Sequence, residues 1–185
     1  KYFLRFSYTE EKNLSKTAVK AQTICSVDLG INTDAVCTIM RADGTVLGRR
    51  FISFSSDKDR LYRVLGRIRR FQRQHGAGQI HSRWAYAKRL NMELSRKVSG
   101  AITACAREYQ ADVIVFEYLE MQGKKTGSRK QRLHMWRKRD IQKLCEYQAH
   151  RSGIRVSRVS ARNTSRLAYD GSGIVARNPE NHSLC

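Results

Sequence analysis

The stretch Thr23-Ile24-Cys25-Ser26-Val27-Asp28-Leu29-Gly30-Ile31 places one carboxylate inside an otherwise apolar run. A short run of this composition predicts a largely buried strand over residues 23–31. An ionised carboxylate in such a strand costs free energy unless a cation or hydrogen bonds compensate it. Asp28 is therefore a candidate functional residue, and Gly30 permits another backbone segment to approach closely.

A second apolar run, Val113-Ile114-Val115-Phe116, ends on Glu117. If the two strands are neighbours in a sheet, they lie ~4.8 Å apart, and Asp28 and Glu117 share one rim. Two such carboxylates can hold Mg²⁺ (or Mn²⁺), because a hard cation prefers carboxylate oxygens together with water and substrate phosphate. The pair predicts two-metal-ion phosphodiester hydrolysis, in which one ion activates a water and the other stabilises the leaving oxygen.

Each carboxylate also has a purely structural interpretation. A single Asp near the end of a strand is often a turn or capping residue. Two further acidic residues compete for a functional role: Asp34 fits a tight turn between strands, and Glu120 fits a solvated loop. The joint position of Asp28 and Glu117 favours metal binding by those two.

The charge of the chain points to a polyanionic partner. The 185 residues contain 36 Lys and Arg against 16 Asp and Glu, a formal net charge of +20. Such an excess favours nucleic acid, because neutralising phosphates releases counterions. The alternative is a basic protein with a solvated surface. No run approaches the ~20 apolar residues of a membrane span, so a membrane partner is not expected.

The five cysteines are widely spaced and contain no CxxC pair. An odd number at wide spacing predicts neither a disulfide framework nor a complete zinc site. Most lie on apolar faces, where free Cys behaves as a small hydrophobe. The histidines have no metal-ligand spacing.

Periodicity predicts an α/β fold. Strand patterns cover five segments: residues 23–31, 35–41, 46–54, 113–117 and 154–157. The turn Ala42-Asp43-Gly44-Thr45 makes the first three strands an antiparallel meander. Helical spacing begins at Leu61, resumes from about residue 80 to 110, and returns in a helix that Gly153 can end. The result is a mixed five-stranded sheet flanked by helices, with a long helical insertion between the third and fourth strands.

The N-terminal segment is expected to lie outside this domain. Residues 1–10 alternate as a strand and are then interrupted. We interpret residues 1–22 as the tail of a preceding β domain plus a linker, and residues 23–185 as the main domain. A chain that opens on Lys1 in mid-strand is expected to be a piece of a longer polypeptide.

Two basic segments are candidates for nucleic-acid contact. One is a stripe along the first helix, for which a solvated helix face is the alternative: Arg60, Arg63, Arg67 and Arg70. The other lies within residues 121–139, which contain no acidic residue and eight basic ones: Lys124, Lys125, Arg129, Lys130, Arg132, Arg137, Lys138 and Arg139. The second segment is expected to face the backbone of a strand entering the carboxylate site.

Three motifs resemble a known family. Residues 27–31 with Ala35 resemble the first RuvC motif of the TnpB and Cas12 nucleases, and Ile114-Val115-Phe116-Glu117-Tyr118-Leu119 resembles the second. Gly153-Ile154-Arg155-Val156 followed by Asn163-Thr164-Ser165 resembles the stretch that leads to their zinc-knuckle insertion. The resemblance covers most of residues 23–170, and the order and spacing of its motifs make it fairly specific.

The resemblance implies an RNase H-like (RuvC) fold and an RNA-guided, Mg²⁺-dependent DNA endonuclease. Asp28 and Glu117 would be two of three metal carboxylates, and the partners would be a guide RNA and a target DNA. The N-terminal strand would complete a wedge-like β-barrel. A prokaryotic host and a cytoplasmic location are implied only by analogy with the family.

The sequence departs from the family pattern in three places. Tyr118 stands where an acidic or amide residue is frequent, and no Cys pair follows Thr164. The zinc-knuckle region from about residue 164 is therefore degenerate, and zinc is not expected. The third catalytic Asp should follow the knuckle, but the chain stops at Cys185, and Asp170 lies too early for that role. The polypeptide alone is accordingly expected to be inactive.

Two alternatives to a guided nuclease remain open. One is a guided DNA-binding module that has lost cleavage. The other is an RNase H-like resolvase that acts on structured DNA without a guide.

Overall fold

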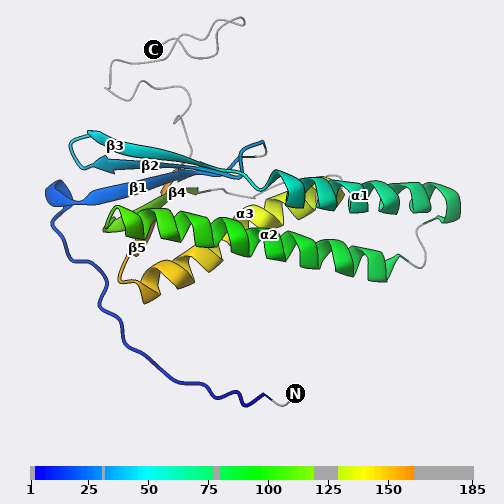
Figure 1. Cartoon of the computed structure of the whole chain (residues 1–185), viewed down its shortest axis with the longest axis horizontal. Coiled ribbons are helices and arrows are strands. Elements are labelled where there is room, and N and C mark those ends of the chain that lie inside the picture. Colours follow the sequence, from blue (N-terminus) through cyan, green and yellow to red (C-terminus); the bar gives the residue numbers. More distant parts are fainter. Residues whose placement is uncertain (1–2, 31, 77–79, 119–128, 161–185) are drawn as a thin grey trace, which may run out of the picture.

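The computed structural model describes residues 3–30, 32–76, 80–118 and 129–160, with side chains in the last range described from residue 137 onward. Figure 1 shows the arrangement of its elements. The strands are β1 (Thr23–Asp28), β2 (Ala35–Arg41), β3 (Val46–Ile52), β4 (Val113–Tyr118) and β5 (Arg155–Ser160). The helices are the 3-10 turn η1 (Val19–Ala21), α1 (Ser55–His75), α2 (His81–Glu108) and α3 (Arg129–Arg151).

The sheet has the strand order β3-β2-β1-β4-β5. β1, β2 and β3 form the antiparallel meander that the turn signal predicted. β4 is parallel to both β1 and β5. The chain reaches β4 from β3 through α1 and α2, which form the predicted helical insertion. The predicted α/β fold with a mixed five-stranded sheet is therefore confirmed.

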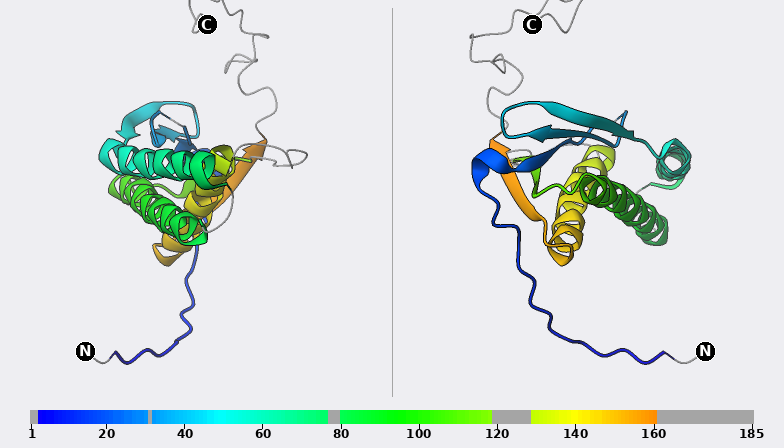
Figure 2. Two further views of the ribbon diagram at one scale, coloured as in Figure 1. Left: turned by 90° about the vertical axis from the view of Figure 1, so that its right-hand side faces the viewer. Right: turned by 60° about the vertical axis from the view of Figure 1, so that its left-hand side comes forward.

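The main core lies between one face of the sheet and the helices α2 and α3 (Figure 1, Figure 2). Alternate strand residues point into it, among them Val27 of β1 and Phe116 of β4. Cys25, Cys37, Cys105 and Cys145 are buried and unpaired, as expected for small apolar side chains. Burial raises the pKa of Cys105 to about 11 and that of Cys145 to about 12, so both stay protonated at neutral pH.

A smaller core joins α1 to the N-terminal half of α2. Leu61, Leu65 and Ile68 of α1 pack with Ala87 and Leu90 of α2. The two helices form a hairpin that projects past the sheet (Figure 1). No helix in the described parts of the chain is both long and apolar enough to cross a bilayer.

The N-terminal segment forms no strand within the described residues. Residues 3–18 contain neither helix nor strand, and Phe3, Leu4, Phe6 and Tyr8 are exposed. An alternating pattern produces a strand only where another strand pairs with it, and no described strand lies beside this segment. The domain boundary at residue 22 stays a prediction.

Asp112 fastens the segment before β1 to the end of the sheet. Its carboxylate accepts hydrogen bonds from the Ser15 and Thr17 hydroxyls, each at 2.6 Å, and from the backbone N–H of Thr23 at 2.9 Å. Partial burial alone would raise the pKa of Asp112, but these hydrogen bonds outweigh it, and the pKa lies below its ordinary value.

Replacing Asp112 by Ala is expected to lower the free energy of unfolding by about 1–3 kcal/mol, because backbone and hydroxyl donors lose their acceptor. Urea unfolding at neutral pH measures the loss, and Asp59→Ala, at an exposed position of α1, is the control. A lowered pKa stabilises the fold above the unfolded value of ~3.9 and ceases to do so as the pH falls through the folded value. The difference from wild type should therefore shrink in acid; a difference independent of pH would contradict the assignment.

Candidate functional site

Asp28 and Glu117 lie side by side at the C-terminal ends of two adjacent parallel strands. Val27 of β1 is in register with Phe116 of β4, so Asp28 and Glu117 occupy the next positions. Val27 and Phe116 point into the core. Because side chains alternate along a strand, the two carboxylates point to the opposite face of the sheet, which none of the described helices covers.

The environment of the two carboxylates differs. Asp28 is exposed, whereas Glu117 is half-buried. The side-chain amide of Gln142, on α3, donates from Nε2 to the carbonyl oxygen of Glu117 at 3.1 Å. This contact ties α3 to the strand end that carries Glu117, and no pattern in the sequence predicted it.

Two described residues after Asp28, Gly30 and Thr33, approach each other closely. A Cβ atom on Gly30 would lie 2.6 Å from the carbonyl oxygen of Thr33, far inside van der Waals contact. Gly30 is therefore required for close backbone approach, as the sequence indicated. The loop turns the chain from β1 into β2 directly beside Asp28.

Asp34 holds this loop against two helices. It is fully buried, and its Oδ2 accepts the backbone N–H of Phe54 at 2.8 Å, at the start of α1. Lys58 of α1 lies 3.5 Å from the same carboxylate and also donates to the carbonyl oxygen of Asn32. Asp34 thus does more than form a turn: it fastens the loop after Asp28 to α1.

The assignment of Arg137 to nucleic-acid contact is wrong. Its side chain is only 4% exposed, and its Nη1 lies 3.4 Å from Oδ1 of Asp34. Removal from water lowers the pKa of Arg137, and the nearby Asp34 carboxylate partly offsets the effect. The helical spacing of the basic segment could not show that Arg137 points into the core, because its partner, Asp34, lies far earlier in the chain.

The other basic candidates fall into three groups. The stripe Arg60, Arg63, Arg67 and Arg70 is exposed on α1, with Arg60 Nη2 donating to the Tyr86 hydroxyl at 2.8 Å. On α3, Arg139 is exposed and Lys138 is half-buried. Lys124 and Lys125 lie outside the described residues, as do the side chains of Arg129, Lys130 and Arg132. Glu120, Asp170 and the region from residue 164 lie outside them too.

The two carboxylates of Asp28 and Glu117 are suitable ligands for a hard cation, but they are only two. Asp28 and Glu117 supply carboxylate oxygens from neighbouring strands, and Mg²⁺ in proteins is held by one or two carboxylates with water and substrate phosphate. Within the part of the chain that the structure describes, no cluster of three or more His, Cys, Asp or Glu could hold a metal. The pair therefore suits one Mg²⁺, and a two-ion site needs ligands beyond the described residues.

Solved structures that share this fold include two Cas12f complexes. One is a Cas12f1-sgRNA-target DNA complex, with a TM-score of 0.57 and 17% identity over 86% of this chain. The other is a CRISPR-Cas12f ternary complex, with a TM-score of 0.59 and 18% identity over 89% of this chain. At this identity the likeness shows the fold, which is consistent with the RuvC-like topology predicted from the motifs.

The chain spans 41% and 33% of the lengths of those two structures' protein chains. No protein-family model matches the sequence, and no curated protein does. The comparisons therefore show the fold of this chain, and its activity, substrates and partners are proposed in the next subsection.

Proposed function

We propose that this chain is the RuvC-like part of an RNA-guided DNA endonuclease of the Cas12 or TnpB kind. The observation that carries the proposal is the placement of Asp28 and Glu117 at adjacent ends of β1 and β4, on the open face of a sheet shared with Cas12f structures. The motifs that resemble the first two RuvC motifs contain these same residues.

In the proposed reaction, Asp28 and Glu117 would hold Mg²⁺. Two-metal-ion chemistry would supply a water activated by one ion for attack on a DNA phosphodiester and a leaving oxygen stabilised by the other. The exposed Asp28 carboxylate faces the substrate side, while the half-buried Glu117 is placed by its strand and by Gln142. Asp34 and Lys58 link the chain that follows Asp28 to the start of α1.

The proposed partners are a guide RNA and a target DNA, like the sgRNA and target DNA in the similar Cas12f1 complex. The net charge of +20 supports this proposal, because it suits a protein that neutralises phosphates. The exposed stripe Arg60, Arg63, Arg67 and Arg70 is a surface on which a nucleic-acid backbone could lie. Base pairing would then read the sequence, while the protein contacts the backbone.

A guided DNA-binding module without cleavage is the second candidate. The observation in its favour is that the described residues contain two site carboxylates and no third. The same fold would then bind the guide and target, with Asp28 and Glu117 as remnants of an ancestral site. A resolvase without a guide is the weaker third alternative.

The test is cleavage of labelled DNA by the full-length protein loaded with its co-expressed RNA, in Mg²⁺ and in EDTA. We expect cleavage only when both the RNA and Mg²⁺ are present. RNA-dependent binding without cleavage would replace the nuclease by the binding module. Cleavage of structured DNA by RNA-free protein would favour the resolvase.

A further inference from the structure

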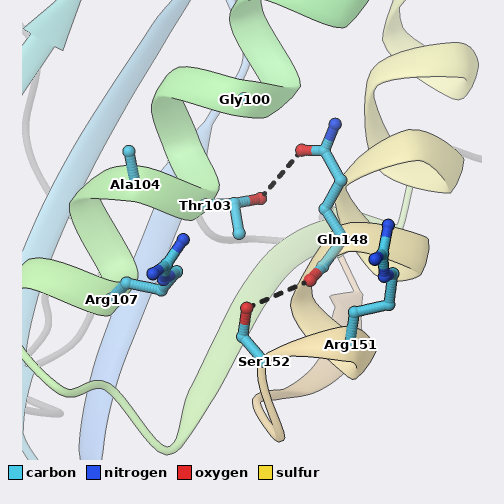
Figure 3. A pocket seen from close by; sticks show the side chains of 7 residues that line it. All are labelled: Gly100, Thr103, Ala104, Arg107, Gln148, Arg151 and Ser152. Carbon is cyan, nitrogen blue, oxygen red and sulfur yellow. Dashed lines mark hydrogen bonds between the residues drawn. The ribbon is translucent and has the colours of Figure 1, made fainter.

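A surface hollow lies between the C-terminal ends of α2 and α3 (Figure 3). Its volume is about 450 Å³, within the range of small-ligand sites. Residues from both helices line it: Gly100, Thr103, Ala104, Arg107, Gln148, Arg151 and Ser152. It adjoins the N-terminal end of β4, whereas Glu117 lies at the C-terminal end, so the hollow is separate from the carboxylate pair.

The charged groups of the hollow are two arginines. Arg107 of α2 and Arg151 of α3 flank it from opposite sides (Figure 3). Among the described residues neither arginine forms an ion pair. The neighbouring acids are turned to other partners, since Glu108 pairs with Arg50 at 2.8 Å and Glu146 pairs with Arg158 at 2.7 Å. The two cationic charges in the hollow are consequently not neutralised by these carboxylates.

The polar groups between the arginines add one further donor, the side-chain amide of Gln148. The Thr103 hydroxyl lies 3.3 Å from Oε1 of Gln148, which leaves the amide nitrogen of Gln148 on the open side (Figure 3). The Ser152 hydroxyl donates to the backbone carbonyl oxygen of Gln148 at 3.4 Å, so it adds no free donor to the hollow (Figure 3). The N–H groups of guanidinium and amide side chains are hydrogen-bond donors only. This lining therefore suits a ligand rich in acceptor oxygens.

Both arginines stand in the last turn of their helices, where the helix dipole stabilises positive charge. That effect explains a cation near each helix end. The helix dipole does not explain why Arg107 and Arg151 face each other across a hollow that no acidic residue lines. Because the carbonyl ends of two helices would repel an anion, binding depends on both guanidinium groups.

An exposed aromatic ring lies beside Arg151, outside the lining of the hollow. Tyr147, on α3, is 64% exposed, and the guanidinium of Arg151 lies 5.9 Å from its ring centroid. Exposed aromatic rings next to cationic grooves stack with nucleobases. The ring therefore distinguishes a nucleic-acid strand from free phosphate.

We propose that this hollow binds the phosphate backbone of a nucleic-acid strand, with Arg107 and Arg151 contacting phosphate and Tyr147 stacking on a base. The proposal rests on the proposed function and adds a nucleic-acid contact at the end of the domain opposite Asp28. RNA and DNA share the phosphodiester chemistry, and the experiment below separates them.

The test compares full-length wild type with the double variant Arg107→Ala and Arg151→Ala. Binding of labelled single-stranded RNA and DNA of matched sequence is measured by fluorescence anisotropy in EDTA, across a salt series. We expect Kd to rise about 10-fold or more for the strand that uses the hollow. The slope of log Kd against log salt should also fall, by about 0.7 for each phosphate of the single strand that the variant no longer neutralises.

A control variant, Arg49→Ala with Arg73→Ala, removes the same charge from exposed positions on β3 and α1. It should weaken binding less than the double variant in the hollow. Tyr147→Ala should weaken binding while leaving the salt slope unchanged, because it removes stacking and no charge. Thermal unfolding of each variant verifies that the fold is retained.

The outcomes separate this proposal from the proposed function. If wild type binds nucleic acid and the hollow variant binds as the control does, the hollow is not a binding site, and the proposed function is untouched. If wild type binds neither RNA nor DNA, both proposals are wrong. A selective loss with RNA or with DNA supports the site and identifies the strand.

Discussion

Replacing Asp28 by Asn is expected to lower the rate of DNA cleavage by the RNA-loaded full-length protein at least about 10²-fold, the loss typical of removing one group that stabilises developing charge. Asn is nearly the same size but lacks the negative charge that would hold Mg²⁺ in the proposed function. Asp28 is exposed at the end of β1, so the fold should tolerate the change. Single-turnover cleavage of labelled DNA at saturating Mg²⁺ measures the effect.

Two variants make this result specific. Glu117→Gln should produce a loss of similar size, because its carboxylate occupies the neighbouring position on β4. Asp43→Asn makes the same chemical change in the exposed turn between β2 and β3 and should leave cleavage at the wild-type rate. RNA and DNA binding should persist in all three. Wild-type cleavage by Asp28→Asn would refute the assignment of the metal site.

Replacing Arg137 by Ala is expected to destabilise the protein by about 3 kcal/mol, because it removes one of the two cations beside the buried carboxylate of Asp34. The other cation, Lys58, lies 3.5 Å from Oδ2 and offsets part of the loss. Urea unfolding measures the change. Because Asp34 holds the loop after Asp28, cleavage should also decrease under conditions where the variant remains folded.

A matched control is available two positions along the same helix. Arg139 is exposed, so Arg139→Ala should change stability by no more than about 0.5 kcal/mol. Combining Arg137→Met with Asp34→Asn removes both charges, keeps an acceptor for the Phe54 N–H, and should recover much of the lost stability. Equal effects of Arg137→Ala and Arg139→Ala would show that the buried pair is unimportant for stability.

The sheet was predictable because strand and helix periods are local signals. The pattern over residues 35–41 matches β2 residue for residue, and Gly153 adopts the positive φ of 75° that ends α3. Asp28 and Glu117 interrupt apolar runs, so their pairing followed once the two strands were taken as neighbours. Residues 3–10 form no strand in this structure, because alternation does not specify a pairing partner.

The sequence was thus sufficient to predict the five strands of the sheet, the helical insertion and the neighbouring positions of Asp28 and Glu117, since each follows from spacing along the chain. Composition alone gave the basic character. Only the tertiary structure decided which charges meet. Arg137 and Asp34 pair across the domain, and Arg107 and Arg151 face one hollow from different helices. Such contacts depend on the distance and orientation between elements far apart in sequence, which are determined by packing of the core and have no local periodic signal.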